Sequence, residues 1–150
     1  MVEAQLGRPV RGSWSVARRC HLGVPMVIEN HPRLDDGSPF PTLYWLTCPI
    51  LVKRASKLES EGWMEQLNER LKEDGLLETR LASALADYER ARDSHEVLVP
   101  APAPPGGGPE RVKCLHAHTA HELVSINPVG ALVLSQAGFP DCRVGCVELR

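Results

Sequence analysis

The sequence is poor in aromatic side chains and has no long apolar run. Aromatic residues make up 5% of the 150 residues, whereas hydrophobic residues make up 43%, an ordinary value for a globular chain. No apolar run approaches the roughly 20 residues that a membrane-spanning helix needs. The first twelve residues lack the apolar stretch that follows the charges of a secretory signal. We therefore expect one cytoplasmic globular domain over residues 1–150, without a membrane partner.

The sequence also lacks an excess of basic charge and a compact CxxC pair. The formal net charge of −2 argues against a general nucleic-acid binder. The five cysteines are an odd number, so at least one thiol is unpaired within the chain. In a reducing cytoplasm, such cysteines are buried core residues, metal ligands or reactive thiolates.

The first half of the chain changes character at Pro49. Residues 1–48 are interrupted by proline and glycine too often for a long helix. Within them, the β-branched and aromatic stretches 26–30 and 42–47 predict antiparallel strands joined by a long loop. Residues 49–96 instead carry apolar residues three and four positions apart, which predicts a helical hairpin. We expect its first helix to weaken near Gly62 and end at Asp74-Gly75, and its second to cover about 76–95.

The second half begins with a linker and ends in a Cys/His segment. Residues 97–110 form the linker, and positions 100–109 contain only Pro, Ala and Gly, which predicts a solvated, partly extended chain. In residues 111–150 we expect short helices over 113–124 and 131–139. The tail 142–149 would be an edge strand or fray. The expected fold class is α+β, with a strand-rich N-terminal part, a helical hairpin, a Pro/Gly linker and a C-terminal helical segment that folds back.

Three cysteines lie beside predicted structural breaks. Cys20 precedes a turn, Cys48 ends a predicted strand, and Cys114 opens the segment KCLHAHTAH. In a helix, Cys114 and His121 share one face while His116 points elsewhere. Thiolate and imidazole are the ligands of zinc, so three cysteines and one histidine would form a closed site that joins both halves of the chain. The alternative is that Cys20 and Cys48 are small buried hydrophobic residues.

Several stretches resemble one known family. QLGRPVRG, VARRC, FPTLYWLTCP, KLESEGWM and RVKCLHAHTAH are similar, in this order, to the bacterial family called domain of unknown function 501. The resemblance runs from Gln5 to about Gly130. It implies a bacterial, cytosolic protein and leaves the activity open.

The resemblance also bears on the ligands. It implies cysteine at the positions of Cys20 and Cys114, histidine at those of His116 and His121, and either residue at Cys48. An exchange of Cys and His is natural for a zinc ligand and awkward for a four-cysteine iron–sulfur cluster. We therefore predict a structural zinc site made by Cys20, Cys48, Cys114 and His121, with His116 as the substitute. Three residues depart from the family pattern and are left out of this set: His118, Cys142 and Cys146.

Two other function classes stay open. The chain could be an enzyme that acts on a small or phosphorylated substrate, either through a metal-bound water or through a cysteine nucleophile. Cys20 beside Arg18 and Arg19 is the candidate nucleophile, with His21 or His116 as its base. Alternatively, the chain could be a metal-free adaptor that docks a protein partner through the helical hairpin. Substrate and oligomeric state are not predicted.

Overall fold

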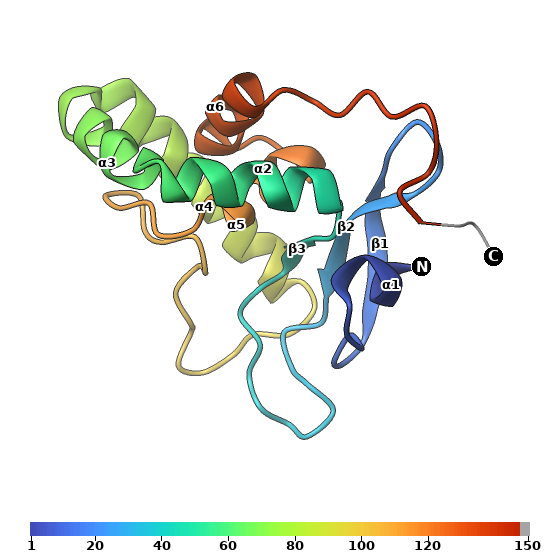
Figure 1. Ribbon diagram of the computed structural model, residues 1–150. Helices are drawn as coiled ribbons and strands as arrows, with labels where there is room; N and C mark the ends of the chain where they lie inside the picture. The colour runs from blue at the N-terminus through green and yellow to red at the C-terminus, as the bar shows by residue number, and fades with distance from the viewer. Residues whose placement is uncertain (148–150) are drawn as a thin grey trace.

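The computed structural model describes residues 1–147, which form a three-stranded sheet and a set of helices (Figure 1). The fold is α+β, as predicted. The elements in chain order are α1 (Val2–Leu6), β1 (Trp14–Arg19), β2 (Pro25–Asn30), β3 (Tyr44–Leu46), α2 (Pro49–Ser60), α3 (Trp63–Glu73), α4 (Gly75–Asp93), α5 (Leu115–Val124) and α6 (Pro128–Ala137).

The sheet is antiparallel throughout, with the strand order β1-β2-β3. The two predicted strands are confirmed as β2 and β3, in a register that pairs Val27 with Leu46 and Ile28 with Trp45. β1 was not predicted, because its residues are exposed or half-buried on both faces and give no apolar alternation. β2 is the central strand and is almost wholly buried, so it anchors the sheet in the core.

The helical hairpin is confirmed, and its first helix is interrupted at Gly62, as predicted. Gly62 adopts a left-handed backbone (φ 82°) between α2 and α3, a conformation that other residues adopt at a cost. Asp74 then ends α3 and caps α4, because its carboxylate accepts the Leu77 backbone N–H at 3.0 Å. The hairpin therefore consists of two consecutive helices, α2 and α3, followed by the longer α4.

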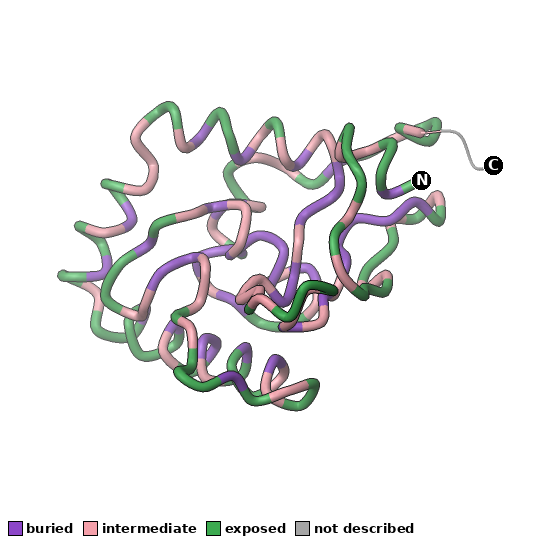
Figure 2. Tube along the Cα trace, turned by 90° about the horizontal axis from the view of Figure 1, so that it is seen from below, coloured by how far each residue is buried: buried purple, intermediate pink, exposed green. Residues whose placement is uncertain are grey.

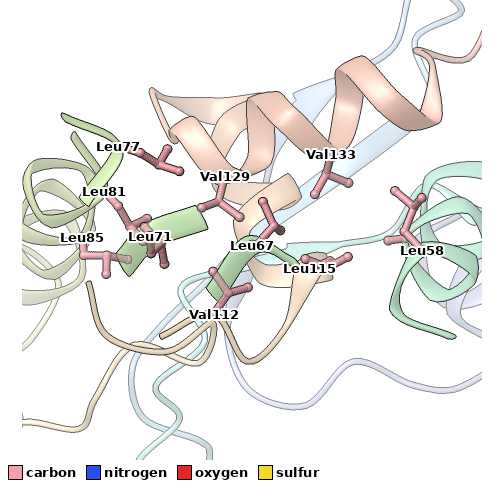
Figure 3. Packing of buried hydrophobic residues seen from close by; sticks show 11 residues of the cluster. Leu58, Leu67, Leu71, Leu77, Leu81, Leu85, Val112, Leu115, Val129 and Val133 are labelled. Atoms are coloured by element: carbon pink, nitrogen blue, oxygen red, sulfur yellow. The ribbon is translucent and has the colours of Figure 1, made fainter. Parts of the chain in front are cut away.

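The core has two parts, and α5 contributes to both. One cluster lies between the helices (Figure 3) and consists of Ala55, Leu58, Leu67, Leu71, Leu77, Leu81, Leu85, Val112, Leu115, Val129 and Val133. The other joins the sheet to α2, α4 and α5, and includes Val27, Leu46, Cys48, Tyr88 and Ala120. Figure 2 shows the buried residues along the inner side of the chain and the exposed residues on the outer helix faces.

The linker is exposed over much of its length, as expected, but its glycine-rich end is packed against the core. Gly106 and Gly107 are buried, and the linker carbonyl groups serve as hydrogen-bond acceptors for the core. Arg92, only 1% exposed, donates from Nη1 to the Pro102 carbonyl oxygen at 2.8 Å. His118 Nε2 lies 2.9 Å from the Gly106 carbonyl oxygen. Residues 100–109, which carry no polar side chain, are thus held in place because buried polar groups need their backbone.

The remaining part of the chain runs from α6 back to the sheet. In Figure 1 this tail reaches the end of the sheet where β1 turns into β2. Residues 142–147 form no strand, and the rest of the predicted edge strand lies outside the described residues. Within the described residues, no helix has the length and apolar character to cross a membrane.

Candidate metal centre

The last turn of α2 meets the first turn of α5 at Glu59. Cys114 is the N-cap residue of α5, and the Glu59 carboxylate accepts the Leu115 backbone N–H at 2.9 Å. A carboxylate at a helix N-terminus satisfies a free N–H group and interacts favourably with the helix dipole. The two helices thereby place an acid, a thiol and the imidazole of His116 at one point.

The three side chains lie close enough together to hold a metal ion. Cys114 Sγ lies 4.0 Å from His116 Nδ1, and this nitrogen lies 3.0 Å from Glu59 Oε1. All three ligand atoms lie within 4.8 Å of one another. In a tetrahedral zinc site, bond lengths of 2.0 to 2.3 Å put such ligand atoms about 3.4 to 3.6 Å apart. Small side-chain rotations would bring the group to that geometry.

The other nitrogen of His116 fixes the orientation of the ring. Nε2 lies 3.2 Å from the Val52 carbonyl oxygen and 3.1 Å from Ser56 Oγ. Because a carbonyl oxygen only accepts, Nε2 carries the proton in that contact, and Nδ1 faces Cys114 and Glu59. Metal-binding histidines commonly donate their second ring N–H to a backbone carbonyl or a carboxylate in this way.

The same contacts shift the pKa values of Cys114 and His116. Burial, the largest single influence, raises the pKa of the Cys114 thiol, but hydrogen bonds from His116 and the Ala117 N–H together bring it below its ordinary value. The hydrogen bond with Cys114 and the nearby Glu59 carboxylate raise the pKa of His116 to about 9, against the effect of burial. Without a metal, the imidazole of His116 is therefore protonated near neutral pH, beside the Cys114 thiol and the Glu59 carboxylate.

Cys114 and His116 face a groove of about 370 Å³. Its other walls come from the segment after α1, from β3 and from α2. Arg8 lies on this wall with its guanidinium carbon 5.0 Å from the centre of the Trp45 ring, a cation–π contact. The groove thus has an aliphatic and aromatic lining, one cation and the thiol–imidazole pair.

A larger groove of about 600 Å³ lies between α4 and α6. No cysteine or histidine lines it, so the candidate chemistry lies in the smaller groove. Two exposed side chains, Leu76 of the hairpin and Ile126 between α5 and α6, line this groove.

The structure divides the predicted zinc ligands among three places. Cys20 and Cys48 line one small pocket, and Cys114 joins His116, the predicted substitute, in the Glu59 group. Among the described residues, Cys20, Cys48, Cys114 and His121 do not have all their ligand atoms within 4.8 Å of one another. Glu59 was not predicted as a ligand, because no spacing along the chain connects it to Cys114.

His121 lies in the core. It is 2% exposed, and its ring centre lies 5.8 Å from that of Tyr44 and 5.3 Å from that of Tyr88. Asn127 Nδ2 lies 3.1 Å from its Nδ1 and 3.0 Å from Nδ1 of His118. Burial lowers the pKa of His121 to about 4. Burial lowers the pKa of His118 as well, so both histidines are neutral around neutral pH, and Nδ1 of each ring lies within hydrogen-bond distance of Asn127.

The fold and the site define a small α+β protein with a Glu/Cys/His group that could hold a metal ion. The chain belongs to the family described as "Protein of unknown function (DUF501)", whose sequence model matches residues 16–101 and 103–135. Glu59, Cys114 and His116 all fall inside the matched residues. No curated protein and no solved structure matches the chain.

Proposed function

We propose that this protein binds a zinc ion through Glu59, Cys114 and His116 and keeps one coordination position open towards the groove. The observation that carries the proposal is the orientation of His116. Its Nε2 donates to the Val52 carbonyl oxygen, while its Nδ1 lies within 4.8 Å of Cys114 Sγ and Glu59 Oε1. A divalent cation would neutralise the two acidic groups that meet at this nitrogen.

The donor set favours zinc among the common metals. Thiolate and imidazole select zinc over calcium or magnesium, and a carboxylate is a frequent third ligand. Structural zinc sites are closed by four protein ligands, whereas catalytic sites have three and leave a position for water or substrate. A zinc ion at an open position polarises a carbonyl or phosphoryl oxygen. The proposal is therefore a cytosolic bacterial enzyme of the metal-dependent type, with a small substrate bound in the groove.

Arg8 supports an anionic substrate. Its guanidinium lies on the groove wall over Trp45, and arginine binds carboxylate and phosphate groups through two parallel hydrogen bonds. The apolar side chains around it would hold the rest of such a molecule.

The test is zinc affinity in the full chain, measured by competition with a coloured chelator. We expect Glu59→Gln to weaken binding at this site by about a hundredfold or more, since changes even to groups behind the ligands cost 10- to 100-fold. Glu61→Gln is the matched control, because Glu61 lies at the same helix end and, among residues 1–147, forms an ion pair with Lys57 alone, at 3.7 Å. Equal affinity in the two variants would contradict the proposal.

A second candidate function uses the same residues without a metal. Cys114 is the N-cap of α5, is hydrogen-bonded to His116, and has a lowered pKa. These are the conditions that make a cysteine a nucleophile, with His116 as its base and Glu59 orienting the imidazole. This role needs the protein to be active after chelation, whereas the zinc proposal requires activity to be lost.

A further inference from the structure

Four of the five cysteines line one small pocket. Cys20 comes from the turn between β1 and β2, Cys48 from the start of α2, and Cys142 and Cys146 from the tail after α6. The pocket holds about 20 Å³ of free space, and a water molecule needs at least about 10 to 15 Å³. There is room for one small ion and for little else.

The core side of this pocket is well fixed. Cys48 is buried, and its backbone N–H donates to the Met26 carbonyl oxygen at 3.3 Å. Cys20 donates its backbone N–H to Val24 at 2.9 Å and accepts that of Gly23 at 2.9 Å. Both cysteines are therefore held by backbone hydrogen bonds at the ends of regular elements, where a rigid ligand is best placed.

The tail side is held by fewer contacts. His21 Nε2 lies 2.8 Å from the Cys142 carbonyl oxygen, and Gln5 Nε2 lies 3.7 Å from Cys146 Sγ. Cys142 is half-buried and Cys146 is exposed. Among the described residues, no three of the four sulfur atoms lie within 4.8 Å of one another, whereas a zinc ion with four thiolates holds them about 3.8 Å apart. The tail would have to move inward to complete such a site.

We propose that Cys20, Cys48, Cys142 and Cys146 bind a second, structural zinc ion that clamps the tail onto the sheet. The ion replaces the thiol protons, which pass to the solvent, and no oxidation takes place. Four thiolates close the coordination shell, so this site would have no catalytic position. It is independent of the Glu59 group.

Only two of the four cysteines of the clamp lie within the residues that the family model matches. The family model matches the sequence only as far as residue 135. Cys20 and Cys48 lie inside the matched residues, whereas both tail cysteines lie beyond them. The proposed clamp thus joins the family fold to a segment outside the match.

The test is the zinc content of the full chain and of two variants, measured by elemental analysis after purification without chelator. We expect two zinc ions per wild-type chain, one in Cys142→Ser/Cys146→Ser and one in Cys114→Ser. Replacing zinc by cobalt in Cys114→Ser should give the intense sulfur-to-metal absorption of a tetrathiolate site, and the tail double variant should not show it. Circular dichroism checks that each variant is folded.

The outcomes separate the two sites. One ion in the wild type that is lost in Cys114→Ser and kept in the tail double variant would overturn the clamp and leave the proposed function intact. One ion with the opposite dependence would support the clamp and contradict the function. A wild-type chain with its tail cysteines in disulfides, lighter by two hydrogen masses for each bond, would also overturn the clamp.

Tryptic cleavage after Arg143 gives a second readout that uses the wild type alone. Arg143 is exposed and lies between the two tail cysteines. If zinc clamps the tail, cleavage there should slow at least about tenfold when zinc is added, because the protease needs an extended, unfixed segment. Equal cleavage rates with zinc and with chelator would overturn the clamp.

Discussion

The carboxylate of Glu59 lies 3.0 Å from Nδ1 of His116. Glu59 belongs to α2 and His116 to α5, and α3, α4 and the linker separate the two helices along the chain. The same carboxylate accepts the first N–H of α5. Glu59 therefore fixes the position of α5 and also completes the group of candidate ligands. Because of this double role, each variant of the site needs both a metal measurement and a stability measurement.

In zinc-free protein, Cys114 should react with iodoacetamide at a lower pH than an ordinary cysteine, because its pKa is lowered. His116→Ala should move the midpoint of the pH–rate profile upwards, since it removes the hydrogen bond and the charge that favour the thiolate. The rate is measured by mass spectrometry on the peptide that contains Cys114. Added zinc should protect this thiol, and a midpoint unchanged by His116→Ala would refute the assigned contact.

Acid should destabilise the fold through His121. Its pKa is about 4 in the folded state and about 6.5 when unfolded, so the unfolded chain binds more protons between these values. The free energy of unfolding should thus fall as pH drops from about 6.5 to about 4, by up to roughly 3 kcal/mol from this residue. Urea titrations at several pH values give the free energy of unfolding as a function of pH, and this free energy should fall less steeply with acid in His121→Phe. An equally steep fall in the variant and the wild type would contradict the assignment.

Gly130 should tolerate no side chain. A Cβ there would lie 2.6 Å from Glu122 Cβ and would also overlap the His118 backbone. We expect Gly130→Ala to lower the free energy of unfolding by about 3 kcal/mol or more, because two packed helices would have to separate. Gly75→Ala is the matched control: a Cβ there meets nothing within 4 Å, so this change should be neutral or stabilise by up to about 1 kcal/mol. Thermal unfolding of both variants measures the difference.

The hydroxyl of Tyr88 should stabilise the sheet. It accepts the Leu43 backbone N–H at 2.6 Å and donates to the Pro41 carbonyl oxygen at 3.1 Å. Tyr88→Phe leaves a buried N–H without a partner, which costs about 1 to 3 kcal/mol. Tyr44→Phe alters a neighbouring ring, 5.7 Å away, and should cost less. If urea denaturation gives the same loss for both, the hydrogen bonds of Tyr88 are not the cause.

The sequence was sufficient to predict the elements whose pattern is local. A few residues are enough to recognise the buried strands β2 and β3 and the regular apolar spacing of α4. β1 escaped prediction because it is an edge strand with little apolar surface, and α1 because one buried residue, Val2, holds it. The docking of the linker depends on Arg92 and His118, which lie outside it.

The candidate site was predictable only in part, for the same reason. Cys114 and His116 stand close together in the sequence and were both named. Glu59 lies beside them because α2 packs on α5, and no local pattern in the sequence predicts that contact. Conversely, Cys142 and Cys146 were set aside because they depart from the family pattern, although they line the pocket of Cys20 and Cys48.

The central place of α5 has a consequence for the order in which the protein is made. This helix contacts all three strands as well as α2 and α6, so it covers a sheet that was completed some seventy residues earlier on the chain. During synthesis, which proceeds at about 5 to 20 residues per second, the inner face of β2 and β3 stays open until residues 115–124 leave the ribosome. For several seconds, the nascent chain would therefore offer apolar surface to chaperones.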